Sequence, residues 1–118
     1  MRLEERTIDM VTVVQVHGDI VLNGSHPSLA DRIRHLLDEN HRRIVLDLAD
    51  VRYVDSGGLG EIVESFTAAR NRGGTVKLLG ITRRLNDLLV ITKLLHVFEC
   101  FETEAEAVQS FGAPAAVR

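Results

Sequence analysis

The sequence is poor in cysteine, proline and aromatic residues. Of its 118 residues, one is cysteine, two are proline and none is tryptophan. A single cysteine, Cys100, cannot form an internal disulfide, which favours a reducing compartment. With four phenylalanines, one tyrosine and a net charge of -3, the chain lacks the basic surface and stacking residues that are typical of nucleic-acid-binding domains. We therefore expect no nucleic-acid partner.

Long apolar runs are absent as well. No stretch approaches the roughly 20 residues of a membrane-spanning helix, and the charged segment Met1–Arg6 does not resemble a signal peptide. We therefore expect no membrane insertion and a cytoplasmic location. The length of 118 residues, with 45% hydrophobic and 26% charged content, predicts one domain over residues 1–118. Its tail, Gly112–Arg118, is expected to fray.

Apolar periodicity predicts strands that alternate with helices. The valine-rich segment Thr7–His17 predicts one or two strands with a turn at Asp9-Met10. Further strands are predicted at Arg43–Leu48, Thr75–Leu79 and Val97–Phe101. After a loop at Asn23-Gly24-Ser25, helices are predicted from Pro27 through Leu37, Ser56 to Asn71, Arg83 to Thr92, and Thr103 through Phe111. This alternation indicates an α/β fold: a mixed, largely parallel β-sheet with about four α-helices packed on it.

One loop carries most of the chemical information. In open parallel sheets, functional loops lie beyond the carboxyl ends of the strands. The loop Asp55-Ser56-Gly57-Gly58-Leu59-Gly60 follows a predicted strand and opens a predicted helix. Glycine in a helix costs up to about 1 kcal/mol relative to alanine, so three in the first turn indicate a close approach to the backbone. A helix N-terminus stabilises an anion by about 0.3–2 kcal/mol, so Ser56 suits phosphorylation.

A purely structural role for this loop stays open. Serine and aspartate are preferred N-caps, so Asp55 or Ser56 could simply cap the helix, and the glycines could only let helix and sheet pack closely. Catalytic motifs do not fit: Glu61 stands where a P-loop needs lysine, Val63 where a dinucleotide fingerprint needs glycine or alanine, and Val54 where a hydrolase elbow needs glycine. We expect no catalytic residue and no cofactor.

Histidine spacing gives no sign of a metal site. The sequence lacks the His-x-x-x-His and Cys-x-x-Cys spacings that metal ligands often adopt. We therefore expect no metal and place the histidines at the surface. They are His17, His26, His35, His41 and His96.

Five segments carry motifs in an order that is specific to one family. They are Gly18-Asp19-Ile20, Ile44–Leu48, the loop Asp55–Gly60, Arg72-Gly73-Gly74 before Val76-Lys77-Leu78, and Arg84-Leu85-x-x-Leu88 leading to Phe98 and Glu102. Over nearly its whole length the chain resembles the STAS domain family, and specifically the bacterial anti-sigma factor antagonists.

This resemblance implies a binding switch at Ser56. A serine-kinase anti-sigma factor would phosphorylate Ser56, and the unmodified protein would bind this kinase and free a sigma factor. A metal-dependent serine phosphatase would reset the cycle. The expected partner-binding residues are Asp55, Ser56, Gly57, Gly58, Gly60, Glu61 and Glu64. Leu59 is expected to turn inward, with Glu61, Glu64 and Ser65 at the rim. The sequence gives no indication of oligomeric state.

Three positions depart from the family pattern. Gly57 stands where relatives commonly carry serine or threonine, Val21 where many carry an acidic residue near the phosphorylated serine, and Lys93 where glycine often closes the third helix. Gly57 and Val21 keep a second hypothesis open, a non-switching STAS interaction subunit of a transporter or a stressosome-like assembly. A third hypothesis, an enzyme with Ser56 as nucleophile toward a small ester, has no base indicated by the sequence.

Apolar residues late in the chain have two candidate roles. Val90, Leu94 and Leu95 exceed what one helical stripe can bury, so they either extend a partner surface or complete the core around the last strand. Cys100 lies in a predicted strand and is expected to be a small buried apolar residue rather than a redox sensor.

Overall fold

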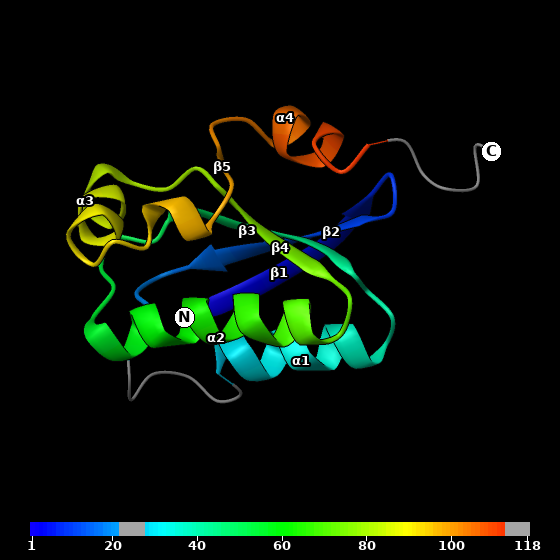
Figure 1. Cartoon of the computed structure of the whole chain (residues 1–118), viewed down its shortest axis with the longest axis horizontal. Coiled ribbons are helices and arrows are strands. Elements are labelled where there is room, and N and C mark those ends of the chain that lie inside the picture. The colour runs from blue at the N-terminus through cyan, green and yellow to red at the C-terminus, as the bar shows by residue number, and fades with distance from the viewer. Residues whose placement is uncertain (22–27, 113–118) are drawn as a thin grey trace.

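The computed structural model describes residues 1–21 and 28–112, which form a five-stranded sheet covered by helices (Figure 1). The strands are β1 (Arg2–Ile8), β2 (Val11–His17), β3 (Arg43–Asp50), β4 (Thr75–Leu79) and β5 (Cys100–Phe101). They lie side by side in the order β1-β2-β3-β4-β5. β1 is antiparallel to β2, and the other neighbouring pairs are parallel. The predicted α/β class with a mixed, largely parallel sheet is confirmed.

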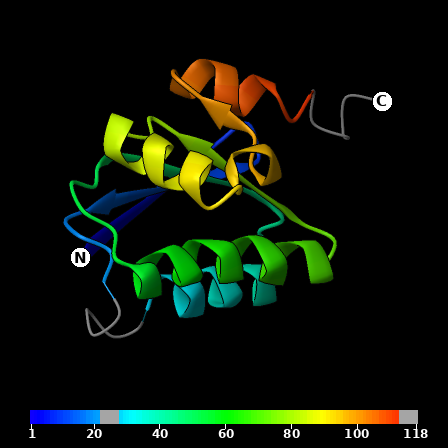
Figure 2. The same cartoon turned by 60° about the vertical axis from the view of Figure 1, so that its left-hand side comes forward.

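Helices cover both faces of the sheet. They are α1 (Leu29–Asp38), α2 (Ser56–Asn71), α3 (Arg83–Ile91), the short 3-10 helix η1 (Leu95–Val97) and α4 (Glu104–Gln109). Figures 1 and 2 show α1 and α2 side by side on one face and α4 on the other, with α3 at the end of the sheet where β4 finishes. The loops that lead from β3 into α2 and from β4 into α3 therefore share one edge.

The sheet separates two apolar clusters. The larger lies between the sheet and the α1–α2 layer, and its centre includes Ile33, Leu46 and Ile62, all fully buried. The smaller lies beneath α4 and consists of Val11, Val13, Val45, Leu79, Ala107 and Val108. Neighbouring residues in the middle of β2 and β3 thus point into different clusters, which explains the consecutive apolar residues Val13-Val14 and Ile44–Leu46. Packing on the larger cluster holds α2 against the sheet, with its first turn near the carboxyl end of β3.

The structure differs from the sequence-based expectations at both ends of the sheet. β1 begins at Arg2 rather than Thr7, because it is an edge strand whose charged side chains face solvent and leave little apolar signal. The expected strand Val97–Phe101 is largely wrong, since residues 95–97 form η1 and only two residues pair with β4. Cys100 is exposed rather than buried, although partial desolvation raises the pKa of its thiol.

Other expectations hold or lie outside the described residues. The turn at Asp9-Met10 joins β1 to β2, and both residues have positive φ angles, 50° and 67°. The loop at Asn23–Ser25 and the helix start at Pro27 lie outside the described residues, as does the expected fraying of the tail beyond Gly112.

Candidate functional site

The candidate site lies where β3 passes into α2, and the segment after β2 holds it in place. The backbone N–H of Ile20 donates to the carbonyl of Tyr53 at 3.0 Å, and the N–H of Asp55 donates to the carbonyl of Ile20 at 3.3 Å. Ile20 and Val54 also form an isolated parallel bridge. These contacts clamp two loops together at the carboxyl edge of the sheet and fix where α2 begins.

Asp55, not Ser56, caps α2. The backbone of Asp55 is extended, and its Oδ1 accepts a hydrogen bond from the N–H of Gly58 at 2.6 Å. Ser56 is the first residue of the helix and is exposed. Since capping is supplied by its neighbour, the Ser56 hydroxyl is presented to solvent at the positive end of the helix dipole.

The glycines of the first turn have different surroundings. A Cβ atom on Gly58 would lie 1.9 Å from the carbonyl oxygen of Ile20, so only glycine fits beneath the clamped segment. A Cβ atom on Gly60 would meet nothing within 4 Å. Leu59, as expected, turns inward and is 8% exposed. The glycines therefore combine close packing at Gly58 with an open, low-profile surface at Gly60.

The acidic residues of α2 contact α1. Oε1 of Glu61 accepts a hydrogen bond from the N–H of Ala30 at 3.0 Å, in the first turn of α1. Glu64 is exposed and pairs with Arg34 at 2.9 Å. The expectation that Ser65 lies at the rim is wrong: it is fully buried and donates to the carbonyl of Glu61 at 2.8 Å.

A shallow groove runs along α2 beside Ser56. It is lined by Ser56, Leu59, Gly60, Val63, Glu64, Thr67 and Leu94. Most of the surface that lines the groove is apolar, so the groove can accept an apolar side chain of a partner next to Ser56. Leu94 and Leu95 also pack against the larger core cluster, whereas Val90 is 52% exposed. Leu94 thus takes both roles that the sequence left open for it, since it lines the groove and packs against the core. Its contact with α2 could not be predicted, because it follows α3 and meets α2 only in three dimensions.

Lys93, one of the departures from the family pattern, sits at a special backbone position. Its φ angle is 62°, in the left-handed region that favours glycine after a helix. The other two departures lie at the site, where Gly57 follows Ser56 and Val21 follows the clamped Ile20.

The histidines occupy different environments. His35 and His96 are exposed, and His26 lies outside the described residues. His17 is partly buried, with Nδ1 2.6 Å from Oδ2 of Asp50, and Nδ1 of His41 lies 2.8 Å from the hydroxyl of Thr12. Within residues 1–21 and 28–112, no three histidine, cysteine or acidic side chains are grouped so that they could hold a metal ion. In that same part of the chain, none of the helices is long and apolar enough to cross a bilayer.

Comparison with known proteins supports the resemblance noted from the sequence. The family model of the STAS domain matches residues 2–107. An anti-sigma-B factor antagonist from Staphylococcus aureus is 30% identical over 107 residues, covering 88% of this chain and 98% of the relative.

Two solved structures share the fold. An anti-sigma-factor antagonist (STAS) domain protein from Planctomyces limnophilus superposes with a TM-score of 0.79 at 15% identity, over 94% of this chain and 98% of that one. The Bacillus cell fate determinant SpoIIAA in its phosphorylated form superposes with a TM-score of 0.70 at 15% identity, over 93% and 99%. From the matched domain model and the S. aureus relative, the chain belongs to the STAS domain family, in its anti-sigma factor antagonist branch.

Proposed function

We propose that this chain is an anti-sigma factor antagonist that switches partner binding through Ser56. Its unmodified form binds a serine-kinase anti-sigma factor and frees a sigma factor. Phosphate on Ser56 ends this binding, and a metal-dependent serine phosphatase restores it. The observation that carries the proposal is the placement of Ser56, an exposed residue that opens α2 while Asp55 does the capping.

The docking surface is built around the start of α2. Ser56, Gly57, Gly60 and Glu64 form its outward part, next to the apolar groove that ends at Leu94. A second group holds this surface in position from behind. It consists of Asp55, which caps the helix, Gly58, which admits the Ile20 carbonyl, and Glu61, which binds the start of α1.

Local electrostatics is sufficient for the switch. Phosphorylation adds a charge of about -1.5 to -2 beside the Asp55 carboxylate. Enclosing that charge in an interface without a matching cation costs several kcal/mol, whereas a hundredfold loss of affinity requires only about 2.7 kcal/mol. In the free protein the helix N-terminus stabilises the phosphate. The domain therefore does not need to refold for binding to end.

Intact mass after incubation with candidate kinases and ATP tests the modification. We expect the wild type to gain one phosphate that maps to Ser56, and Ser56→Ala to gain none. Thr75→Ala is the matched control, because Thr75 is an exposed hydroxyl residue at the start of β4, away from the β3–α2 loop. It should be modified like the wild type. A phosphate that persists in Ser56→Ala would contradict the assignment of the site.

Kinase binding tests the switch itself. Wild type and Ser56→Ala should bind equally, and Ser56→Asp should bind at least about a hundredfold more weakly, a difference of about 2.7 kcal/mol. Equal affinity of all three proteins would remove Ser56 from the mechanism. A partner that binds the wild type but never modifies it would instead support the non-switching interaction subunit.

A further inference from the structure

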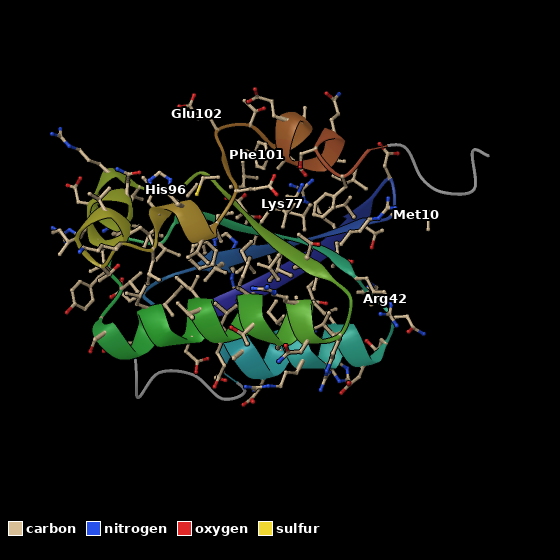
Figure 3. The ribbon with its side chains drawn as sticks, viewed as in Figure 1. Met10, Arg42, Lys77, His96, Phe101 and Glu102 are labelled. Atoms are coloured by element: carbon tan, nitrogen blue, oxygen red, sulfur yellow. The ribbon has the colours of Figure 1, made fainter. Side chains whose placement is uncertain are left out.

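The two ends of the molecule carry apolar side chains that its own core does not use. Val90, Ile91 and Val97 are 52%, 77% and 40% exposed, and Met10 is 61% exposed. The longest dimension of the molecule is 43 Å, and Figure 3 shows Met10 at one end and His96, in η1, on the side of α3, which forms the other end. Exposed apolar side chains that gather at defined places mark interaction surfaces.

The end formed by α3 and η1 is apolar with a basic border. Along α3, Arg83, Arg84, Val90 and Ile91 are all exposed, and they recur at helical spacing on one face. Exposed Lys93 and Val97 follow directly. Between residues 83 and 97 the three cations are accompanied by a single acidic residue, Asp87. We call Arg83, Arg84, Val90, Ile91, Lys93 and Val97 the α3 patch.

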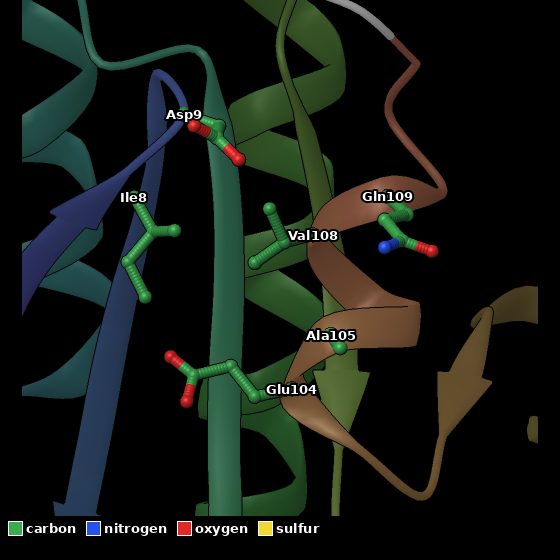
Figure 4. Close-up of a pocket in the computed structure, with 6 residues that line it drawn as sticks. All are labelled: Ile8, Asp9, Glu104, Ala105, Val108 and Gln109. Carbon is green, nitrogen blue, oxygen red and sulfur yellow. The ribbon is translucent and has the colours of Figure 1, made fainter.

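The opposite end contains an apolar pocket with an acidic border. It lies between the β1–β2 turn and α4 and is lined by Ile8, Asp9, Glu104, Ala105, Val108 and Gln109 (Figure 4). We call it the hairpin–α4 pocket. The carboxylates that line it are those of Asp9, which is exposed, and Glu104, which pairs with Arg6 at 2.6 Å. Glu106, two residues further along α4, is exposed as well.

The turn beside this pocket is a two-residue hairpin loop. Ile8 pairs with Val11, and Asp9 and Met10 between them have φ angles of 50° and 67°, the positive values that a type I′ hairpin needs at both central positions. The hairpin leaves Met10 exposed, directly after the pocket residues Ile8 and Asp9.

We propose that this chain associates head to tail with a second copy of itself, the α3 patch of one copy docking in the hairpin–α4 pocket of the next. Apolar side chains with a basic border face an apolar pocket with an acidic border, and this charge complementarity selects the second copy as the occupant. Because the surfaces differ and lie at opposite ends, the contact is heterologous, and each copy can bind two others.

The association is weak and sensitive to salt. Each surface carries only about six side chains, which falls short of the about 1,200 Å² that stable complexes bury. Added salt screens the charged borders. Sedimentation velocity of the full chain at low salt, from about 10 μM to about 1 mM, where weak complexes form, should show a weight-average mass that rises beyond that of a dimer. The mass should fall again at high salt.

Two variants block one end each. Ile91→Ser removes the most exposed apolar side chain of the α3 patch, and Ala105→Arg places a bulky cation in the pocket. Both positions are exposed, and circular dichroism verifies that the variants fold. Each variant alone should remain monomeric. The control His35→Arg, which adds a cation at an exposed position of α1, should associate like the wild type.

Mixing the two variants is the decisive measurement. Ile91→Ser keeps an intact pocket and Ala105→Arg keeps an intact α3 patch, so an equimolar mixture should form dimers and nothing larger. A wild type that stays monomeric throughout would overturn the proposal. So would single variants that associate like the wild type, or a mixture that associates no better than either variant alone. Ser56→Ala should associate like the wild type, so this result is independent of the proposed switch.

Discussion

Gly58 and Gly60, two residues apart in α2, are predicted to respond in opposite ways to the same substitution. Gly58→Ala places a Cβ atom 1.9 Å from the Ile20 carbonyl oxygen, so helix and clamped segment must separate. We expect a loss of about 1–3 kcal/mol in the free energy of unfolding. Gly60→Ala meets open space and removes backbone entropy from the unfolded chain, so we expect a gain of about 0.5–1 kcal/mol.

Urea unfolding of the two variants measures this difference directly. The midpoint should fall for Gly58→Ala and rise for Gly60→Ala, with unchanged slopes, because the surface exposed on unfolding stays the same. Equal destabilisation by both substitutions would mean that the open surroundings of Gly60 are not as the structure has them.

Asp55 and Ser56 are neighbours with separable roles. Asp55→Ala removes the acceptor for the Gly58 N–H and should lower the free energy of unfolding by about 1 kcal/mol. Asp55→Asn should keep most of the wild-type stability, because asparagine is also a preferred N-cap. Ser56→Ala alters an exposed residue outside the cap and should stay within about 0.5 kcal/mol of the wild type. Thermal unfolding of the three variants measures both roles. A loss from Ser56→Ala as large as that from Asp55→Ala would make the serine part of the cap.

At the scale of elements, a buried lysine anchors the end of α4 in addition to the apolar contacts of the helix. Nζ of Lys77 donates to the hydroxyl of Ser110 at 2.8 Å and to its carbonyl at 3.3 Å, and it lies 4.2 Å from the centre of the Phe111 ring. It is also 3.3 Å from a carboxylate oxygen of Glu99. Ala107 and Val108 bury the apolar face of α4 in the smaller cluster, and Lys77 adds polar bonds to Ser110, directly after the helix.

Lys77→Ala should therefore loosen α4 without unfolding the rest. Hydrogen bonds to a charged group contribute about 1.5–3 kcal/mol, so amide exchange of residues 104–109 should accelerate roughly tenfold to a hundredfold. Exchange in the middle of α2 should not change. Ser110→Ala, which removes one acceptor only, should give a smaller effect on the same amides. An equal acceleration in α2 would show that Lys77 supports the whole fold.

How well an element could be predicted depended on where its stabilising contacts come from. The bounds of α2 were predicted as they are, because its cap and its apolar stripe are both local in sequence. β1 was placed too late because an edge strand with solvent-facing charges has no apolar period. β5 was overestimated because its two residues are held by pairing with β4, not by their own composition.

In the candidate site, too, features fixed by local sequence could be predicted and features fixed by distant contacts could not. Asp55, Ser56 and Gly58 could be found because a cap, a helix start and a glycine turn leave marks in the sequence. Ser65 was misplaced at the rim, since a polar side chain that bonds back to its own helix is indistinguishable in sequence from one that faces solvent. Position 58 requires glycine because the Ile20 carbonyl lies directly against it. The sequence could not show this contact, because the two loops that form it are distant in sequence.

At the scale of the whole molecule, the sheet behind α2 makes the switch a local one. α2 is fixed at its start by the clamp through Ile20 and along its length by a core in which Ile62 is fully buried. A charge added at Ser56 meets the positive end of the helix dipole and should stabilise the free protein by about 0.3–1 kcal/mol. The same charge should weaken partner binding. Phosphorylation of Ser56 is therefore expected to stabilise the free protein and to destabilise its complex with the partner.

Ser56→Asp tests this separation in the free protein. Its unfolding midpoint should equal or exceed that of Ser56→Ala, and its amide resonances should shift only near residues 18–21 and 54–60, which meet at the clamp. Amides of β4 and α4 should keep the wild-type positions, since the Lys77 contacts lie on the opposite face of the sheet. Shifts that spread through the sheet, together with a lowered midpoint, would mean that the charge acts by reshaping the domain. The loss of binding would then be conformational, and the electrostatic cost at the interface would no longer be its cause.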